Sequence, residues 1–180
     1  LGLLRDGDFV LEPRLMLEMH IFRADGSADD EVYIALNEAA VVRGSHAQVM
    51  RVTVDVGDSR MATYVCDGVV IASPTGSTGY SFSAGGPIIE PTSRNLVVTP
   101  IAAYLTPLRS SVVGPQHVVS ATVQAARDCL VSIDGRRDIP LEVGDRVEVR
   151  AREKPISFIQ PRGALPFWDL LRQKAELLPD

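Results

Sequence analysis

The sequence predicts a mainly β domain: an antiparallel β-sandwich-like fold with a short helix after a Gly/Ser/Thr-rich loop and one helix at its carboxyl end. Three observations support this fold class. The apolar segments are short, turn-forming residues separate them, and only the last segment repeats its apolar residues at helical spacing. With 180 residues, 46% of them apolar and 23% charged, the chain has the length and composition of one globular domain.

Ten segments have the length and apolar content of strands, and turn formers separate most of them. They cover residues 15–22, 31–42, 47–56, 60–66, 68–73, 95–103, 116–123, 129–133, 145–151 and 156–160. Asp134 and Gly135 tolerate the positive φ of a tight turn, so they predict a hairpin. Pro166 precedes a pattern with helical spacing, which predicts a helix over 166–178.

Charge and composition exclude several classes of partner. The net charge is −5 and the basic residues are scattered, which argues against nucleic-acid phosphates and anionic membranes. No apolar run is long enough for a membrane span. Cys66 and Cys129 lack metal-ligand spacing and are expected as buried small residues, which fits a cytoplasmic location. Because the chain begins with Leu, we expect a fragment or the ordered part of a longer chain.

The loop "SPTGSTGYSFSAGG", residues 73–86, follows the apolar run "GVVIA". It has no lysine for a P-loop and no GxGxxG spacing. Thr75 occupies the first glycine position of a GxSxG elbow around Ser77, and Glu90 is the one acid between Ser77 and His117. Two interpretations remain. The loop and a short helical turn over 77–84 bind a polar ligand with Tyr80 as a stacking ring, or the loop is a glycine-rich connector at a sheet edge.

Asn37 and Glu38 lie side by side inside the apolar segment "YIALNEAAVV". An amide and a carboxylate in a core strand are costly unless partners satisfy them. Adjacent strand residues face opposite ways, so we expect the strand to end or bulge here if both reach one ligand. Such a pair suits two vicinal sugar hydroxyls, and with an aromatic ring nearby it favours a nucleoside.

Four segments together resemble the carboxyl-terminal domain of the NAD kinases, the enzymes that phosphorylate NAD to NADP. They read "ALNEAAVVRG", "CDGVVIASPTGSTGYSFSAGGPIIEP", "LVVTPIA" and "VSIDG", and the resemblance runs over most of the chain. It implies that residues 1–14 are a connector from a missing amino-terminal α/β domain. Residues 15–165 are then the β-rich NAD-binding domain, and 166–180 a helix packed on or next to it.

The resemblance also implies roles for individual residues. Asn37 and Glu38 hold the hydroxyls of the adenosine ribose, and Asp67 contacts the dinucleotide near its nicotinamide end, although Asp67 also fits a turn before Gly68. The remaining positions form the loop and turn that grip NAD, with Tyr80 stacking on a base: Ser77, Thr78, Gly79, Tyr80 and Ser83. Asp134 matches the family as well, and its hairpin context favours a structural role.

The reaction implied is phosphoryl transfer from ATP, or from polyphosphate, to the 2′-hydroxyl of the adenosine ribose, with a divalent cation such as Mg or Mn. The family's Gly-Gly-Asp-Gly-Thr motif is absent from this chain, so we expect no catalytic residue and no metal ligand in it, and no activity of the fragment alone. The expected partners are NAD, ATP and further copies of the chain in a homodimer or homotetramer. A lipid or diacylglycerol kinase domain and a non-enzymatic dinucleotide sensor are the alternatives.

Overall fold

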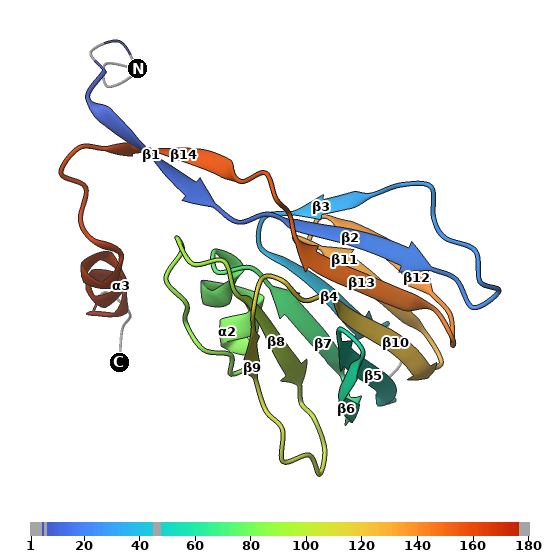
Figure 1. Cartoon of the computed structure of the whole chain (residues 1–180). Helices are drawn as coiled ribbons and strands as arrows, with labels where there is room; N and C mark the ends of the chain where they lie inside the picture. Colours follow the sequence, from blue (N-terminus) through green and yellow to red (C-terminus); the bar gives the residue numbers. More distant parts are fainter. Residues whose placement is uncertain (1–4, 6, 45–47, 177–180) are drawn as a thin grey trace.

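Two six-stranded antiparallel sheets face each other, and a two-stranded ribbon extends from them (Figure 1). This computed structural model describes residues 5, 7–44 and 48–176. The elements are β1 (Phe9–Arg14), β2 (Leu17–Phe22), β3 (Tyr33–Ala35), β4 (Glu38–Arg43), β5 (Met50–Val56), β6 (Ser59–Cys66), β7 (Gly68–Ala72), η1 (Gly76–Thr78), α2 (Tyr80–Ser83), β8 (Leu96–Ile101), β9 (Ser111–Val113), β10 (Val119–Ala125), β11 (Cys129–Ile133), β12 (Arg137–Leu141), β13 (Arg146–Ala151), β14 (Ile156–Pro161) and α3 (Phe167–Glu176).

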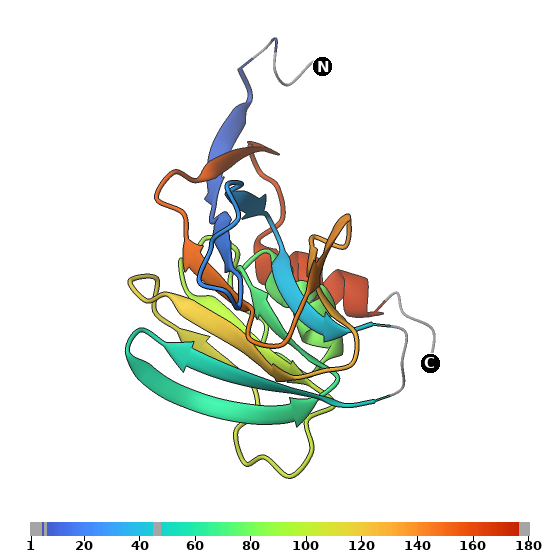
Figure 2. The ribbon, with the colours of Figure 1, turned by 90° about the vertical axis from the view of Figure 1, so that its right-hand side faces the viewer.

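The first sheet has the strand order β3-β2-β13-β10-β5-β6, and the second sheet has the order β12-β11-β4-β7-β8-β9. The core lies between them, because alternate residues of each strand point inward. In the first sheet Leu17, Met19 and Ile21 are fully buried, and in the second sheet Val69 and Ile71 are too. Figure 2 shows the two layers from the side. The mainly β, antiparallel fold class that the sequence predicted is confirmed.

The chain passes from the first sheet to the second at Leu36 and Asn37. β3 is the edge strand of the first sheet, and β4 lies inside the second sheet between β11 and β7. Residues 36 and 37 form a bend, so the predicted segment 31–42 is two strands rather than one. The sequence argument that the strand must end or bulge at Asn37 and Glu38 is therefore confirmed.

The outer face of the second sheet is covered only in part. η1 and α2 follow β7 and lie over β7 and β8 (Figure 1). Ala40, Val70, Ala72 and Val97 form a second small core beneath this cover. On the outer face of β4, β11 and β12 a hollow is open beside α2.

Two short strands were not expected from the sequence. β9 pairs with β8, and β1 pairs with β14 in register from Phe9 with Pro161 to Arg14 with Ile156. β1 lies within the segment 1–14 that was expected to be a connector. The carboxyl-terminal helix is present as α3, which starts one residue later than expected. No helix in the described part of the chain is long and apolar enough to cross a membrane.

Candidate functional site

The candidate site is a hollow of about 300 Å³ on the outer face of the second sheet. Its lining residues come from β4, α2 and the β11–β12 hairpin, and they are Glu38, Ala40, Val42, Tyr80, Leu130, Ser132, Gly135 and Asp138. Even-numbered residues of β4 line the hollow, because odd-numbered Ala39 and Val41 point into the core. The structure thus brings Glu38 and Tyr80 together, although 42 positions separate them in the sequence.

The bend before Glu38 is held from one side by Asp134. The Asp134 carboxylate accepts hydrogen bonds from three backbone N–H groups: Leu36 at 2.8 Å, Asn37 at 2.7 Å and Glu38 at 3.0 Å. The backbone N–H of Asp134 in turn donates to the Glu38 carbonyl at 3.0 Å. Asp134 and Gly135 have φ of 50° and 62°, so the hairpin predicted for them is present. The bonds of Asp134 agree with the structural role that its hairpin context favoured.

Ser73 holds the same bend from the other side. Its hydroxyl donates to the Leu36 carbonyl at 2.5 Å, and its backbone N–H donates to the Asn37 carbonyl at 2.8 Å. The same hydroxyl accepts from the Gly76 N–H at 3.2 Å, which ties the bend to the loop. We call the bonds of Asp134 and Ser73 to residues 36–38 the 36–38 clamp. All of these bonds go to main-chain atoms of residues 36–38, where the chain changes from one sheet to the other.

Gly76 lets the loop approach the bend closely. A Cβ atom at Gly76 would lie 2.2 Å from the carbonyl oxygen of Asn37, so a side chain there has no room. At Gly79 the nearest atoms to a Cβ would be the Gly76 oxygen at 3.3 Å and the Glu38 carboxylate at 3.6 Å. The glycine-rich loop therefore lies directly against Asn37 and beside Glu38.

The loop presents several of the predicted residues to solvent. Thr78, Gly79, Tyr80 and Ser83 are exposed, and the Tyr80 side chain keeps 44% of its surface accessible. Tyr80 and Ser83 are three residues apart on α2 and therefore share a face of the helix. Buried Ser81 anchors this helix through a 2.9 Å hydrogen bond to Thr99 of β8. The exposed Tyr80 ring beside Glu38 can stack on a planar ligand.

Ser77 differs from its neighbours because its side chain is fully buried. Its hydroxyl donates to the Pro74 carbonyl at 2.7 Å and accepts from the Ile89 N–H at 2.9 Å. The hydroxyl is therefore used within the loop. The packing argues against a direct contact between the Ser77 hydroxyl and a ligand, and it gives Ser77 the task of shaping the loop.

Asp67 precedes β7 at the end of that strand opposite to Glu38, and it does not line the hollow. Glu38 pairs with Ala72, whereas Val42 pairs with Gly68, the residue after Asp67. Five residues along a strand span about 16 Å, at roughly 3.3 Å per residue. Asp67 forms an ion pair with Arg43 at 2.9 Å, and its side chain is about one-third exposed. The structure does not bring Asp67 into the hollow, so one molecule that contacts both must be extended.

Glu38 sits in an environment that favours its protonated form. Partial burial raises the pKa of the Glu38 carboxyl, and the negative charge of Asp134 raises it further. Asp138 contributes a second carboxylate to the lining of the same hollow. Asp138, Ser132 and Ser73 were missed by the sequence argument. The available signals for the first two were the alternation of β11, which turns Ser132 outward, and the hairpin after Ile133, which brings Asp138 beside it.

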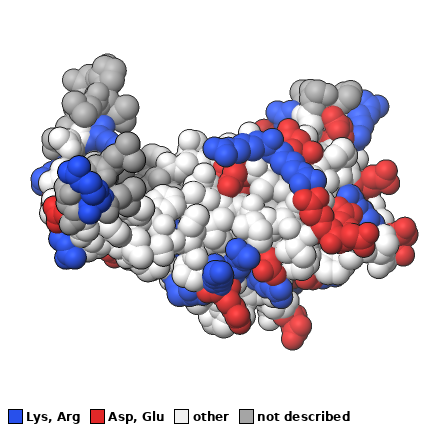
Figure 3. Space-filling view, turned by 90° about the horizontal axis from the view of Figure 1, so that it is seen from above, with Lys and Arg blue, Asp and Glu red and all other residues white. Residues whose placement is uncertain are grey.

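The surface charges of the molecule are mixed in sign. Figure 3 shows basic and acidic side chains interspersed on one face. Several charges form ion pairs: Arg150 pairs with Glu18, and Arg23 pairs with Asp29 and Asp145. In the described part of the chain, no three His, Cys, Asp or Glu side chains gather in a way that could hold a metal ion. The described residues therefore do not by themselves fit the divalent cation that the family resemblance implies.

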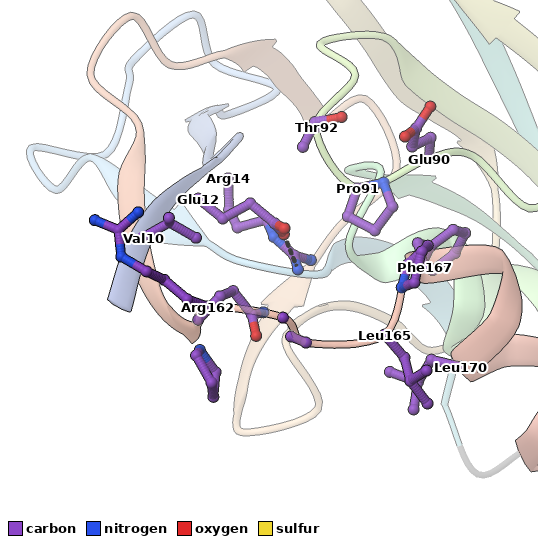
Figure 4. A pocket seen from close by; sticks show the side chains of 15 residues that line it. Val10, Glu12, Arg14, Glu90, Pro91, Thr92, Arg162, Leu165, Phe167 and Leu170 are labelled. Carbon is purple, nitrogen blue, oxygen red and sulfur yellow. Dashed lines mark ion pairs between the residues drawn. The ribbon is translucent and has the colours of Figure 1, made fainter. Parts of the chain in front are cut away.

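A larger hollow, of about 750 Å³, lies between the β1–β14 ribbon and the start of α3 (Figure 4). Val10, Leu165 and Leu170 line it together with the ion pair of Glu12 and Arg14. None of the predicted site residues lines this hollow. We therefore place the candidate site in the smaller hollow beside α2.

The chain is similar to known proteins over most of its length. Residues 36–161 match the family described as the ATP-NAD kinase C-terminal domain. The chain is 38% identical to the NAD kinase of Heliobacterium modesticaldum over 171 residues, 94% of the chain and 59% of the relative. It is 41% identical to the NAD kinase of Symbiobacterium thermophilum over 169 residues, 93% of the chain and 59% of the relative. The chain thus spans about three fifths of the length of these relatives.

Two solved structures have a similar fold. One is a yeast NADH kinase complexed with NADH, with a TM-score of 0.83 and 26% identity over 98% of this chain and 50% of that one. The other is an NAD kinase from Archaeoglobus fulgidus in complex with ATP, with a TM-score of 0.76 and 25% identity over 98% of this chain and 64% of that one. The matched residues 36–161 begin at the bend and include the whole hollow.

Proposed function

The chain belongs to the ATP-NAD kinase C-terminal domain family, and from this premise we propose that it is the dinucleotide-binding domain of an NAD kinase. The complete enzyme transfers a phosphoryl group from ATP, or from polyphosphate, to the 2′-hydroxyl of the adenosine ribose of NAD. The single observation that carries the proposal is the shared hollow of Glu38 and Tyr80, with the Asn37 bend against its loop.

The adenosine half of NAD is proposed to bind at this hollow. Asn37 and Glu38 hold the two ribose hydroxyls, because an amide and a carboxylate supply the donor and acceptors that vicinal hydroxyls need. Tyr80 stacks on the adenine ring, and Thr78, Gly79 and Ser83 offer polar groups from the exposed side of the loop. Ser77 supports the loop from below. Asp67, about 16 Å along the strand direction, is left to the nicotinamide end of the extended dinucleotide.

The contribution of this chain to the reaction is binding and orientation of the hydroxyl that accepts the phosphoryl group. Phosphoryl transfer depends mostly on positioning and on neutralisation of charge. Glu38 binds and orients the ribose in this proposal, and we assign the proton of the 2′-hydroxyl to no residue of this chain. A divalent cation bound with ATP would supply charge neutralisation. We propose that the chain alone is inactive.

The same proposal includes a cytoplasmic enzyme that assembles from identical copies, as a homodimer or homotetramer. Exposed apolar side chains in the loop between β8 and β9 support assembly. Tyr104 is 66% exposed, Leu105 85% and Leu108 41%. Burying such groups against a second copy is favourable because it removes apolar surface from water.

Titration calorimetry tests the ligand class. NAD, NADP and a diacylglycerol are each titrated into the chain up to about 1 mM, the upper end of common KM values. The proposal expects heat from the dinucleotides and none from the diacylglycerol, which would instead bind if the chain were a lipid kinase domain. NADP formation by the complete gene product, compared with that by the chain alone, separates a kinase from a non-enzymatic dinucleotide sensor.

A further inference from the structure

We propose that Asp134 is a positioning residue of the dinucleotide site, whose carboxylate fixes the 36–38 bend so that Glu38 lies in the hollow with Asn37 beside it. The inference rests on the proposed function for its ligand. Its geometric basis is the three backbone N–H groups of residues 36–38 that converge on the Asp134 carboxylate. Asp134 does not contact the reacting atoms in this proposal. It acts through the backbone of the two residues that do contact the ribose.

The three N–H groups of the bend depend on the Asp134 carboxylate as their acceptor. Between β3 and β4 the chain leaves one sheet and enters the other, so residues 36–38 have left the ladder of the first sheet and only begin that of the second. A buried backbone N–H without a partner is costly, and charge-assisted bonds to a carboxylate are stronger than neutral ones. One side chain from a distant hairpin satisfies three successive N–H groups here.

The turn at Asp134 does not itself require a carboxylate. Asp134 has φ of 50°, a conformation that asparagine adopts as readily as aspartate. A turn residue would therefore be served equally well by Asn. The three N–H bonds would not, because an amide offers one acceptor oxygen and presents an NH₂ group in place of the other. The Asn37 and Glu38 N–H groups share one carboxylate oxygen, and the Leu36 N–H uses the other. The substitution Asp134→Asn therefore keeps the turn, removes the acceptor of either the Leu36 N–H or the other two, and takes the charge from the bonds that remain.

The charge of Asp134 also acts on the pKa of Glu38. Burial is the larger cause of its raised pKa, and the charge of Asp134 is the second. The other titratable groups that line the hollow are Asp138 of β12 and Tyr80 of α2. Removing the charge of Asp134 therefore lowers the pKa of Glu38.

The experiment compares Asp134→Asn with Asp58→Asn in the complete gene product. Asp58 lies in the β5–β6 turn of the other sheet and is exposed, so it is a matched control for an aspartate in a hairpin. We expect Asp134→Asn to raise the Kd and the KM for NAD at least tenfold, about 1.4 kcal/mol, with a smaller fall in kcat and an unchanged KM for ATP. The pH midpoint of NAD binding should move to lower pH. Asp58→Asn should change none of these.

Hydrogen exchange of the amides tests the same inference without a ligand. In Asp134→Asn at least one of the amides of Leu36, Asn37 and Glu38 should exchange at least tenfold faster, because asparagine keeps only one of the two acceptor oxygens. The amide of Ala121 in the central strand β10 should keep its rate. Unchanged exchange at 36–38, equally faster exchange at Ala121, or wild-type affinity for NAD in Asp134→Asn would each overturn the proposal. If the wild-type protein binds no dinucleotide, the proposed function fails, and the exchange rates still decide whether Asp134 holds the bend.

Discussion

Replacing Gly76 by alanine measures how tightly the glycine-rich loop packs against the Asn37 bend. The new Cβ would lie 2.2 Å from the Asn37 oxygen, 2.5 Å from its carbonyl carbon and 2.8 Å from its Cα. All three are backbone atoms held by the 36–38 clamp, so they cannot move aside as a flexible side chain would. Overpacking costs about 1–3 kcal/mol, and we expect Gly76→Ala to lie near about 3 kcal/mol.

At roughly 2–4 °C per kcal/mol for a domain of this size, a loss of about 3 kcal/mol lowers the Tm by about 6–12 °C. Urea unfolding of the purified chain gives the free energy of unfolding directly, and calorimetry gives the Tm. Affinity for NAD should fall as well, because the loop and the bend must separate. The substitution pushes apart the glycine-rich loop and the Asn37 bend, which the proposal requires to be close.

Gly79→Ala is the matched control, since the same methyl group is added three residues later. The nearest atom to the Cβ would be the Gly76 carbonyl oxygen at 3.3 Å, a tight contact without the backbone overlap that Gly76 would have. We expect Gly79→Ala to lower the free energy of unfolding by at least about 1 kcal/mol less than Gly76→Ala does, because the backbone has to shift less. Equal unfolding free energies for Gly76→Ala and the wild type would refute the close approach of loop and bend.

Three further outcomes follow from the site. Tyr80→Ala should weaken NAD binding about 10-fold to 100-fold with little change in Tm, since stacking on a base contributes about 1–3 kcal/mol, and Tyr80→Phe should retain most of the affinity in calorimetric titration. Asp67→Asn should change the unfolding free energy by less than about 1 kcal/mol, because its ion pair with Arg43 is partly exposed, and should weaken NAD but not 5′-AMP. Because the pKa of Glu38 is raised in the folded protein, its contribution to the free energy of unfolding falls as the pH rises past its ordinary pKa of 4.5. Glu38→Gln should remove this fall, measured by urea unfolding from below pH 4.5 to neutral pH. The same substitution should weaken NAD binding.

The fold could be predicted from the sequence where local patterns decide the outcome. Alternating or apolar segments between turn formers marked most of the strands, and the polar pair Asn37 and Glu38 marked the place where a strand had to break. β9 and β1 were not expected. Each is stabilised by a partner strand, β8 or β14, rather than by an apolar pattern of its own. Strand propensity is weak where cross-strand pairing decides.

The site could be predicted only in part, because contacts between segments far apart in the sequence decide it. Tyr80 and Glu38 were placed together from the kinds of residue present, and the structure agrees. Ser77 was grouped with the ligand contacts, yet only its burial reveals that its hydroxyl is used by Pro74 and Ile89. The bonds of Ser73 and Asp134 to the bend depend on strand register across 37 and 98 positions of sequence. A local pattern carries no record of that register.

The 36–38 clamp also bears on how this site can be altered. Ser73 and Asp134 grip main-chain atoms of Leu36, Asn37 and Glu38, so the shape of the bend does not depend on which side chains occupy positions 37 and 38. New side chains at those two positions would inherit the same placement on the scaffold. Redesign of the site for a different sugar or nucleotide can therefore begin with substitutions at positions 37 and 38, while the backbone around them is left intact.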